Sequence, residues 1–266
     1  MPVYTVDFHT HCKGDPIDHL SHSVGQHIDA AVAAGLDALA ITWHTKVFDQ
    51  PKWIKRAAQR GLLLIPGVEV NLERKYHTLV LNVTPEEVSG HASVAELRDL
   101  RERRGPDILI IAPHPYYLIG GSLGKMLDRH ADLFDAVEWC HLHCDAVPGK
   151  INPNERARRW ARRHGKPILQ CSDAHVASAV GRWPSRIEAE APTPRALFDA
   201  ARAGRVEFEP ESITVRETAR KVGKVAWDYT KGAFGAGSVA RNRKARREHA
   251  GRPTGRQVRS VDAVNT

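Results

Sequence analysis

The sequence of 266 residues has no long apolar run and few cysteines. No stretch approaches the ~18 apolar residues of a membrane span. The first residues, Met1–Tyr4, lack the basic start and apolar continuation of a secretory leader. The four cysteines lie among candidate ligand segments and do not suggest a disulfide framework. We therefore expect a cytoplasmic protein with reduced thiols and no membrane contact.

Positive charge is unevenly distributed along the chain. Residues 216–266 hold 13 Lys/Arg and 4 Asp/Glu, which gives +9, whereas residues 1–215 hold 26 and 27, which gives −1. The sequence pI of about 9.5 therefore belongs to the C-terminal segment and not to the body of the protein.

Apolar strands alternate with amphipathic helices over the first 205 residues. The predicted strands are 3–8, 36–42, 62–70, 78–83, 108–112, 136–140 and 167–171. The predicted helices are 24–34, 52–60, 94–103, 123–130, 153–164 and 195–203. Such alternation predicts a mostly parallel sheet. Polar residues at nearly every strand end favour a sheet closed into a barrel.

One connection is too short for a crossover helix. Only residues 71–77 separate the strand that ends near Glu69 from the next strand. This pair should be antiparallel, which would bring His77 beside Glu69.

Histidine and carboxylate side chains recur at the carboxyl ends of the predicted strands. This end is where chemistry gathers in α/β folds, and N/O ligand sets suit Zn, Mn or Fe. A single His-x-His pair is weak evidence, but the coincidence at many strands predicts a metal enzyme. The residues concerned are His9, His11, His44, Glu69, His114, Asp173 and His175.

Six segments together resemble the ordered motifs of the PHP (polymerase and histidinol phosphatase) family. They are Asp7-Phe8-His9-Thr10-His11, Ala40-Ile41-Thr42-Trp43-His44, Pro66-Gly67-Val68-Glu69, His77-Thr78-Leu79-Val80-Leu81, Ala112-Pro113-His114-Pro115 and Ser172-Asp173-Ala174-His175. The resemblance covers about residues 3–210. It implies a distorted seven-stranded (β/α)7 barrel, two or three divalent metal ions, and hydrolysis of a phosphoester by a metal-activated hydroxide, with no side chain as nucleophile.

The resemblance also implies a ligand set. One ion would be held by His9, His11, Glu69 and Asp173. A second would be held by Glu69, His77 and His114, with Glu69 bridging the two ions. His44 and His175 would hold a third ion together with one residue of the loop that follows His11.

Two segments depart from the family pattern. Trp43 stands where family members usually carry Asp, either as a core or rim aromatic residue or as a surface on which a substrate ring stacks. The loop 12–23 lacks the common Ser-Asp-Gly, so either Asp15 or His19 would supply the missing ligand, and we favour Asp15.

Several further residues are candidates for other roles. Lys46, His141 and Arg182 are candidate contacts for a substrate phosphate, against the alternative that the two cations are ordinary surface charges. The segment 138–144, Glu-Trp-Cys-His-Leu-His-Cys, has the composition of a zinc knuckle, but its ligand spacing is narrower than in most four-ligand sites.

The sequence predicts three regions: a barrel at 1–211, an amphipathic basic helix at 212–234 and a disordered basic tail at 235–266. The tail is a solvated segment or a weak nucleic-acid contact, since basic arms gain affinity from counterion release. For the barrel we predict hydrolysis of a small soluble phosphoester. The alternatives are an amidohydrolase-type C–N or C–O hydrolase and a binding module that has lost its activity.

Overall fold

The structure, a computed structural model, describes residues 1–117, 120–214 and 216–217. Its strands are β1 (Val3–Asp7), β2 (Ala38–Ile41), β3 (Leu63–Leu72), β4 (Tyr76–Leu81), β5 (His91–Ala92), β6 (Leu109–Ala112), β7 (Ala136–Cys140), β8 (Ile168–Cys171), β9 (Ser185–Glu188) and β10 (Val206–Glu207). Its α-helices are α1 (Val24–Ala33), α2 (Pro51–Ala58), α3 (Val94–Arg104), α4 (Lys125–Arg129), α5 (Pro153–His164) and α6 (Pro194–Arg202).

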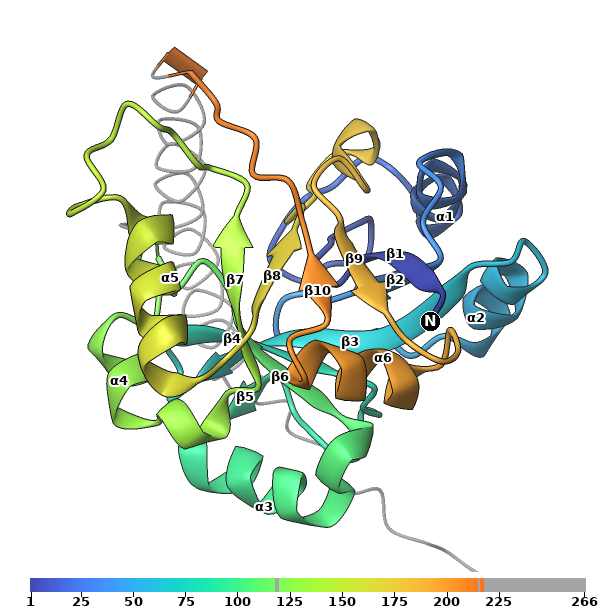
Figure 1. Cartoon of the computed structure of the whole chain (residues 1–266). Coiled ribbons are helices and arrows are strands. Elements are labelled where there is room, and N and C mark those ends of the chain that lie inside the picture. The colour runs from blue at the N-terminus through green and yellow to red at the C-terminus, as the bar shows by residue number, and fades with distance from the viewer. Residues whose placement is uncertain (118–119, 215, 218–266) are drawn as a thin grey trace, which may run out of the picture. The chain divides into compact units, whose positions relative to one another are not determined.

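The strands form one strongly curved sheet with helices around its outside (Figure 1). The order is β10-β9-β1-β2-β3-β4-β6-β7-β8, with β5 beside β3. Strand β4 runs antiparallel to both of its neighbours, which confirms the predicted antiparallel pair and distorts the barrel. The seven predicted strands correspond to β1, β2, β3, β4, β6, β7 and β8.

Strand β9, which sequence reasoning missed, nearly closes the barrel. It pairs antiparallel with β1. Its other edge pairs with β10. At the start of β9, the amide of Gln170 in β8 donates to the Ser185 hydroxyl at 2.8 Å, and that hydroxyl donates to the Gln170 carbonyl at 3.0 Å. A side chain thus joins two strands that share no backbone ladder.

The barrel interior is filled by alternate residues of the strands. In β2, for example, Ala38 and Ala40 point inward whereas Leu39 and Ile41 pack under α1 and α2. Helix α6 packs its apolar residues into the same inner cluster, where the ring centroids of Phe8 and Phe198 are 6.0 Å apart.

The ends of several helices follow from local sequence signals. Ser93 and Glu96 form a reciprocal capping box at the start of α3, and the Thr193 hydroxyl accepts from the amide of Ala196 at the start of α6. Gly165 ends α5 in the left-handed conformation at a φ of 60°. The predicted helices are therefore confirmed to within a few residues, although α4 is shorter than expected.

The predicted C-terminal helix and tail lie almost entirely outside the described residues. The first described residues of that segment contact the body of the protein: the Ile213 amide donates to the His143 carbonyl at 2.8 Å, and the Ile213 side chain is buried. Within the part of the chain that the structure describes, no helix has the length and apolar character of a membrane span.

Candidate metal centre

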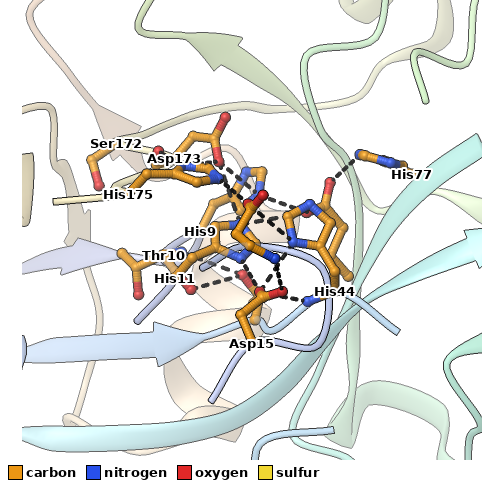
Figure 2. Close-up of polar contacts among 12 residues, drawn as sticks. His9, Thr10, His11, Asp15, His44, His77, Ser172, Asp173 and His175 are labelled. Carbon is orange, nitrogen blue, oxygen red and sulfur yellow. Dashed lines mark hydrogen bonds and ion pairs between the residues drawn. The ribbon is translucent and has the colours of Figure 1, made fainter. Parts of the chain in front are cut away.

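One cluster collects the polar residues that follow or end the strands (Figure 2). His9 and His11 follow β1, His44 follows β2, Glu69 and His77 lie within the β3–β4 pair, His114 follows β6, and Asp173 and His175 follow β8. Two of these residues have a left-handed backbone, His114 at a φ of 29° and Asp173 at 47°. Such a backbone is uncommon for a residue with a side chain and occurs repeatedly at functional sites as well as in turns.

The carboxylate of Glu69 lies at the centre of the cluster and is 1% exposed. Its Oε1 is 2.7 Å from His77 Nδ1 and 3.4 Å from His114 Nε2. Its Oε2 is 3.1 Å from His44 Nε2 and 3.4 Å from both His9 Nε2 and His11 Nε2. One carboxylate therefore contacts five imidazoles, which is the arrangement expected of a bridging ligand.

Glycine fixes the position of His77. The His77 amide donates to the Gly121 carbonyl at 2.7 Å. A Cβ on Gly121 would lie 2.2 Å from the His77 ring, and the φ of this glycine is 85°. Only glycine allows the backbone to approach the ring this closely.

Asp173 is the second carboxylate of the cluster. Its Oδ1 lies 3.3 Å from His9 Nε2, 3.4 Å from His11 Nε2 and 3.6 Å from His175 Nδ1. The Nε2 atoms of His9 and His11 thus face the same two carboxylates, Glu69 and Asp173.

The loop after His11 brings two further carboxylates to the cluster. Asp15 is buried, and its Oδ2 lies 3.0 Å from both His11 Nδ1 and His44 Nδ1. Asp18, which sequence reasoning missed, has its Oδ2 2.8 Å from His175 Nε2 and 3.6 Å from His44 Nδ1. His19, the alternative to Asp15, is exposed and belongs to none of the candidate ligand groups among the described residues.

A second missed residue, Glu138, lies fully buried in β7. Its Oε1 is 3.3 Å from His9 Nδ1, and its Oε2 accepts from the His114 amide at 2.7 Å. Glu138 contacts the Nδ1 atom of His9, whose Nε2 atom faces Glu69. Asp15 likewise contacts the Nδ1 atom of His11, whose Nε2 atom also faces Glu69. Carboxylate–histidine pairs of this kind usually orient metal ligands and fix their tautomer.

The carboxylates shift the pKa values of the surrounding histidines. Burial lowers the pKa of His44, but the nearby carboxylate of Glu69 outweighs it and raises the pKa to about 9. Burial also lowers the pKa of His175, but the negative charge of Asp173 outweighs this effect and raises the pKa to about 9. Without a metal ion these imidazoles are therefore cations near pH 7 and neutralise the carboxylates. Divalent ions would take over that role by displacing the protons.

Two buried atoms in the cluster test whether a metal ion fits. His11 Nε2 and Glu69 Oε1 are close to other ligand atoms, yet neither makes a well-oriented hydrogen bond within the described residues. Ligand atoms about 2.0–2.2 Å from one cation lie about 3.0–3.4 Å apart without pointing at one another. The separations of 2.7–3.4 Å around Glu69 are close to that range, so the residues fit metal ions.

Four groups of potential ligands have their atoms within 4.8 Å of one another. They are His9, His11 and Asp173; His11, His44 and Glu69; Glu69, His77 and His114; and Asp15, Asp18 and His44. All of the nine predicted ligands except His175 occur in these groups, and His175 contacts Asp18 and Asp173.

Trp43 is a core residue. It is 2% exposed, its ring packs edge-on against Phe48 with centroids 5.0 Å apart, and its indole N–H donates to the Cys12 carbonyl at 3.1 Å. Of the two interpretations of Trp43, stacking against a substrate is therefore excluded.

The three predicted phosphate contacts have other neighbours. Lys46 Nζ lies 5.3 Å from the ring centroid of Trp43. Arg182 is exposed, lies over Trp183, and has its Nε 3.8 Å from a Glu211 carboxylate oxygen. The ring centroid of His141 is 5.1 Å from that of Trp183.

The segment 138–144 contains no group of three close ligands within the described chain. Cys140, Leu142 and Cys144 instead form a small apolar cluster with Ile213. All four cysteines lie in described segments, are buried and form no disulfide there.

Two segments of the sequence match known families. Residues 7–114 match the PHP domain, and residues 152–206 match a PHP-associated region. The matched segments contain all nine predicted ligands, from His9 to His114 in the first and Asp173 and His175 in the second. A comparison with curated protein sequences gives no significant match.

Solved structures share the fold at low sequence identity. A two-domain protein from Bacteroides vulgatus with a predicted PHP-like metal-dependent phosphoesterase is 16% identical, with a TM-score of 0.58 over 78% of this chain and 65% of its own. PsfC from Pseudomonas syringae is 17% identical, with a TM-score of 0.54 over 86% of this chain and 99% of its own.

The lesion-specific endonuclease Q from Pyrococcus furiosus is 19% identical, with a TM-score of 0.53 over 78% of this chain. This chain spans 65% of the Bacteroides protein and 58% of the endonuclease, so both carry regions without a counterpart here. At sequence identities of 16–19%, these similarities establish a shared fold only.

Proposed function

The chain belongs to the PHP family, and from this premise we propose that it is a metal-dependent phosphoesterase that acts on a small phosphorylated substrate. The observation that carries the proposal is Glu69, a buried carboxylate with five imidazoles within 3.4 Å. Such a concentration of imidazoles around one buried carboxylate must be balanced by positive charge, either as protons on the histidines or as bound divalent ions that replace those protons.

The residues divide into ligand sets as the family resemblance implies. His9, His11, Glu69 and Asp173 would hold one ion, and Glu69, His77 and His114 a second. His44 and His175 would hold a third with a loop carboxylate, and Asp18 fits this place as well as Asp15, since it contacts both histidines. Divalent ions of the Zn, Mn or Fe type supply positive charge for phosphate oxygens and make water nucleophilic near neutral pH.

The protein itself orients these ligands and shapes access to them. Glu138 and Asp15 hold the Nδ1 atoms of His9 and His11, which leaves the Nε2 atoms directed at Glu69 and Asp173. His9 and His11 are completely buried, whereas the side chains of His175 and Asp18 are 38% and 33% exposed. A substrate would therefore approach from the side of His175 and Asp18.

The size of the substrate is limited by the connections of the fold. Only 36 residues separate His77 from His114, and β5, α3, β6 and the rest of β4 account for more than half of them. No inserted domain is available there to bind a polymer, which favours a small phosphomonoester.

A substrate panel tests the proposal. The purified full chain, loaded with Mn²⁺ or Zn²⁺, should release nitrophenol from a generic phosphoester, lose this activity on chelation and regain it when metal is restored. The panel should include a phosphodiester, an amide and a lactone. Metal-loaded protein that turns over no phosphoester contradicts the proposal. Turnover of the amide alone would indicate an amidohydrolase, and less than one bound metal per chain would indicate a binding module.

A further inference from the structure

A polar hollow lies beside helix α5 and shares no residue with the metal cluster. Its volume is about 360 Å³. It is lined by Tyr116, Asp128, Lys150, Arg156, Arg159, Trp160 and Arg163. Four of these seven side chains are cations and one is a carboxylate, so the lining has a strong excess of positive charge.

The hollow follows from the residue spacing on α5. Arg156, Arg159, Trp160 and Arg163 are spaced i, i+3, i+4 and i+7, which places them on one face of the helix. Trp160 is buried in the wall, whereas the three arginines are exposed. Arg162 is exposed on the same helix but does not line the hollow.

Two of the arginines are held in place by neutral groups. The Arg156 guanidinium lies 4.1 Å from the centroid of the Tyr116 ring. Arg159 donates to the carbonyls of Gly149 at 2.8 Å and Lys150 at 3.2 Å. These contacts restrict the guanidinium groups without neutralising their charge, which lowers the entropy lost when a ligand binds.

The lack of carboxylate partners sets these arginines apart from those of α3. In α3 the arginines 98, 101, 103 and 104 each form an ion pair with an Asp or Glu. In the described part of the chain, the ion pair within α5 joins Arg158 to Glu155, and none of the ion pairs involves Arg156, Arg159 or Arg163. The chain thus gathers three guanidinium groups around one hollow, and Asp128, the one carboxylate in the lining, balances only part of their charge.

We propose that this hollow is an anion site for a ligand that carries two or more phosphate groups. Guanidinium groups match phosphate oxygens with paired, charge-assisted hydrogen bonds, and the volume is that of a small-molecule site. The phosphates would come either from a free diphosphate compound or from a nucleic-acid backbone. The proposal does not depend on the reaction proposed for the metal cluster.

Calorimetric titration with a nucleoside α,β-methylene diphosphate, whose P–C–P bond resists hydrolysis, tests the site. The full metal-loaded chain is compared with the variants R156A/R163A, R162A and E69Q. Loss of two charge-assisted contacts should weaken binding about 100-fold in R156A/R163A, at about tenfold for each contact. R162A, the matched control, should change affinity by less than about threefold, and E69Q should keep the site. All of the replaced arginines are exposed, so unchanged far-UV dichroism is expected.

A second assay distinguishes the two possible sources of the phosphate groups. It measures the binding of a labelled single-stranded oligonucleotide to the same variants by fluorescence anisotropy. All of these variants keep the C-terminal segment. Weaker binding in R156A/R163A, with a log–log salt slope reduced by about 0.7 per lost contact, supports the site with nucleic acid as the source. Unchanged oligonucleotide binding with weakened diphosphate binding supports it with a small metabolite. The proposal would be overturned if R156A/R163A and R162A changed the affinity for both probes equally. It would also be overturned if diphosphate binding disappeared only in E69Q.

Discussion

Replacing Glu69 by glutamine removes one negative charge from the centre of the cluster while the side chain keeps its size. Glutamine retains one oxygen acceptor and gains an amide that only donates hydrogen bonds. Since Oε1 faces His77 and His114 and Oε2 faces His9 and His44, the amide must face one of these pairs. One predicted metal group loses its carboxylate ligand, and the other exchanges an anionic oxygen for a neutral one.

The magnitude follows from this geometry. Altering a group that only orients a metal ligand costs 10–100-fold in metal affinity, so loss of a bridging ligand should cost at least about 100-fold, or about 2.7 kcal/mol. We expect at least one ion per chain to be lost and phosphoester turnover to fall by about 10³ or more. In metal-free protein, breaking a buried charge pair costs about 3–5 kcal/mol, which lowers the melting temperature of a domain of this size by about 10 °C.

Elemental analysis, initial rates and thermal denaturation with and without chelator measure these effects. Glu86→Gln, which changes an exposed glutamate, is the matched control and should leave all three quantities unchanged. The far-UV dichroism of Glu69→Gln should match that of the parent protein. Normal metal stoichiometry together with normal turnover would remove Glu69 from the site and refute the reasoning.

Three further predictions concern other parts of the chain. Glu138→Gln should weaken metal binding about 10–100-fold in a chelator competition, because it removes the charge that orients His9, and unchanged affinity would contradict this role. At Asp135 burial raises the pKa, but two paired guanidinium groups outweigh it and hold the pKa below its usual range. The contribution of Asp135 to the free energy of unfolding should therefore be complete above a pH of about 4 and be lost as pH falls through the lowered pKa. Urea unfolding of Asp135→Asn should show a deficit of about 3–5 kcal/mol at pH 7 that shrinks in acid, and a deficit that grows in acid would be inconsistent with the pairing. Truncation after Glu217 changes the net charge from +8 to −1 and removes none of the predicted ligands. Turnover of a small phosphoester should persist in the truncated chain while nucleic-acid affinity falls, and a folded but inactive truncation would show that the removed segment completes the site.

The strands and the histidines at their ends could be predicted because both depend on short-range pattern. Apolar runs of four to six residues ended by His or Asp signal a strand that delivers a side chain to one edge of the sheet. The short connection predicted at residues 71–77 was enough to place His77 beside Glu69, since seven residues cannot form a crossover between parallel strands. The observed connection between β3 and β4 is shorter still, at residues 73–75. Local spacing thus determined which residues meet.

The missed features depend on contacts between distant segments. Strand β9 has four residues and alternates buried with exposed side chains, a pattern too short to distinguish from a loop. Asp18 reaches the site through its contact with His175, which lies 157 residues later in the sequence. Glu138 is a single charge inside an apolar strand, and this was the available signal, because a buried carboxylate requires a partner.

The pairing of β1 with β9 has a consequence for how the protein is made. Strand β1 leaves the ribosome well before its antiparallel partner β9, which follows roughly 180 residues later in the chain. The Asp7 carboxylate likewise accepts hydrogen bonds from the amides of Ser172 and Gly181, which are synthesised much later. At about 5–20 residues per second, one edge of β1 stays uncovered for about 10–40 s of synthesis. The His-x-His pair therefore emerges long before Asp173, and the complete metal cluster can form only when translation of the barrel is nearly finished.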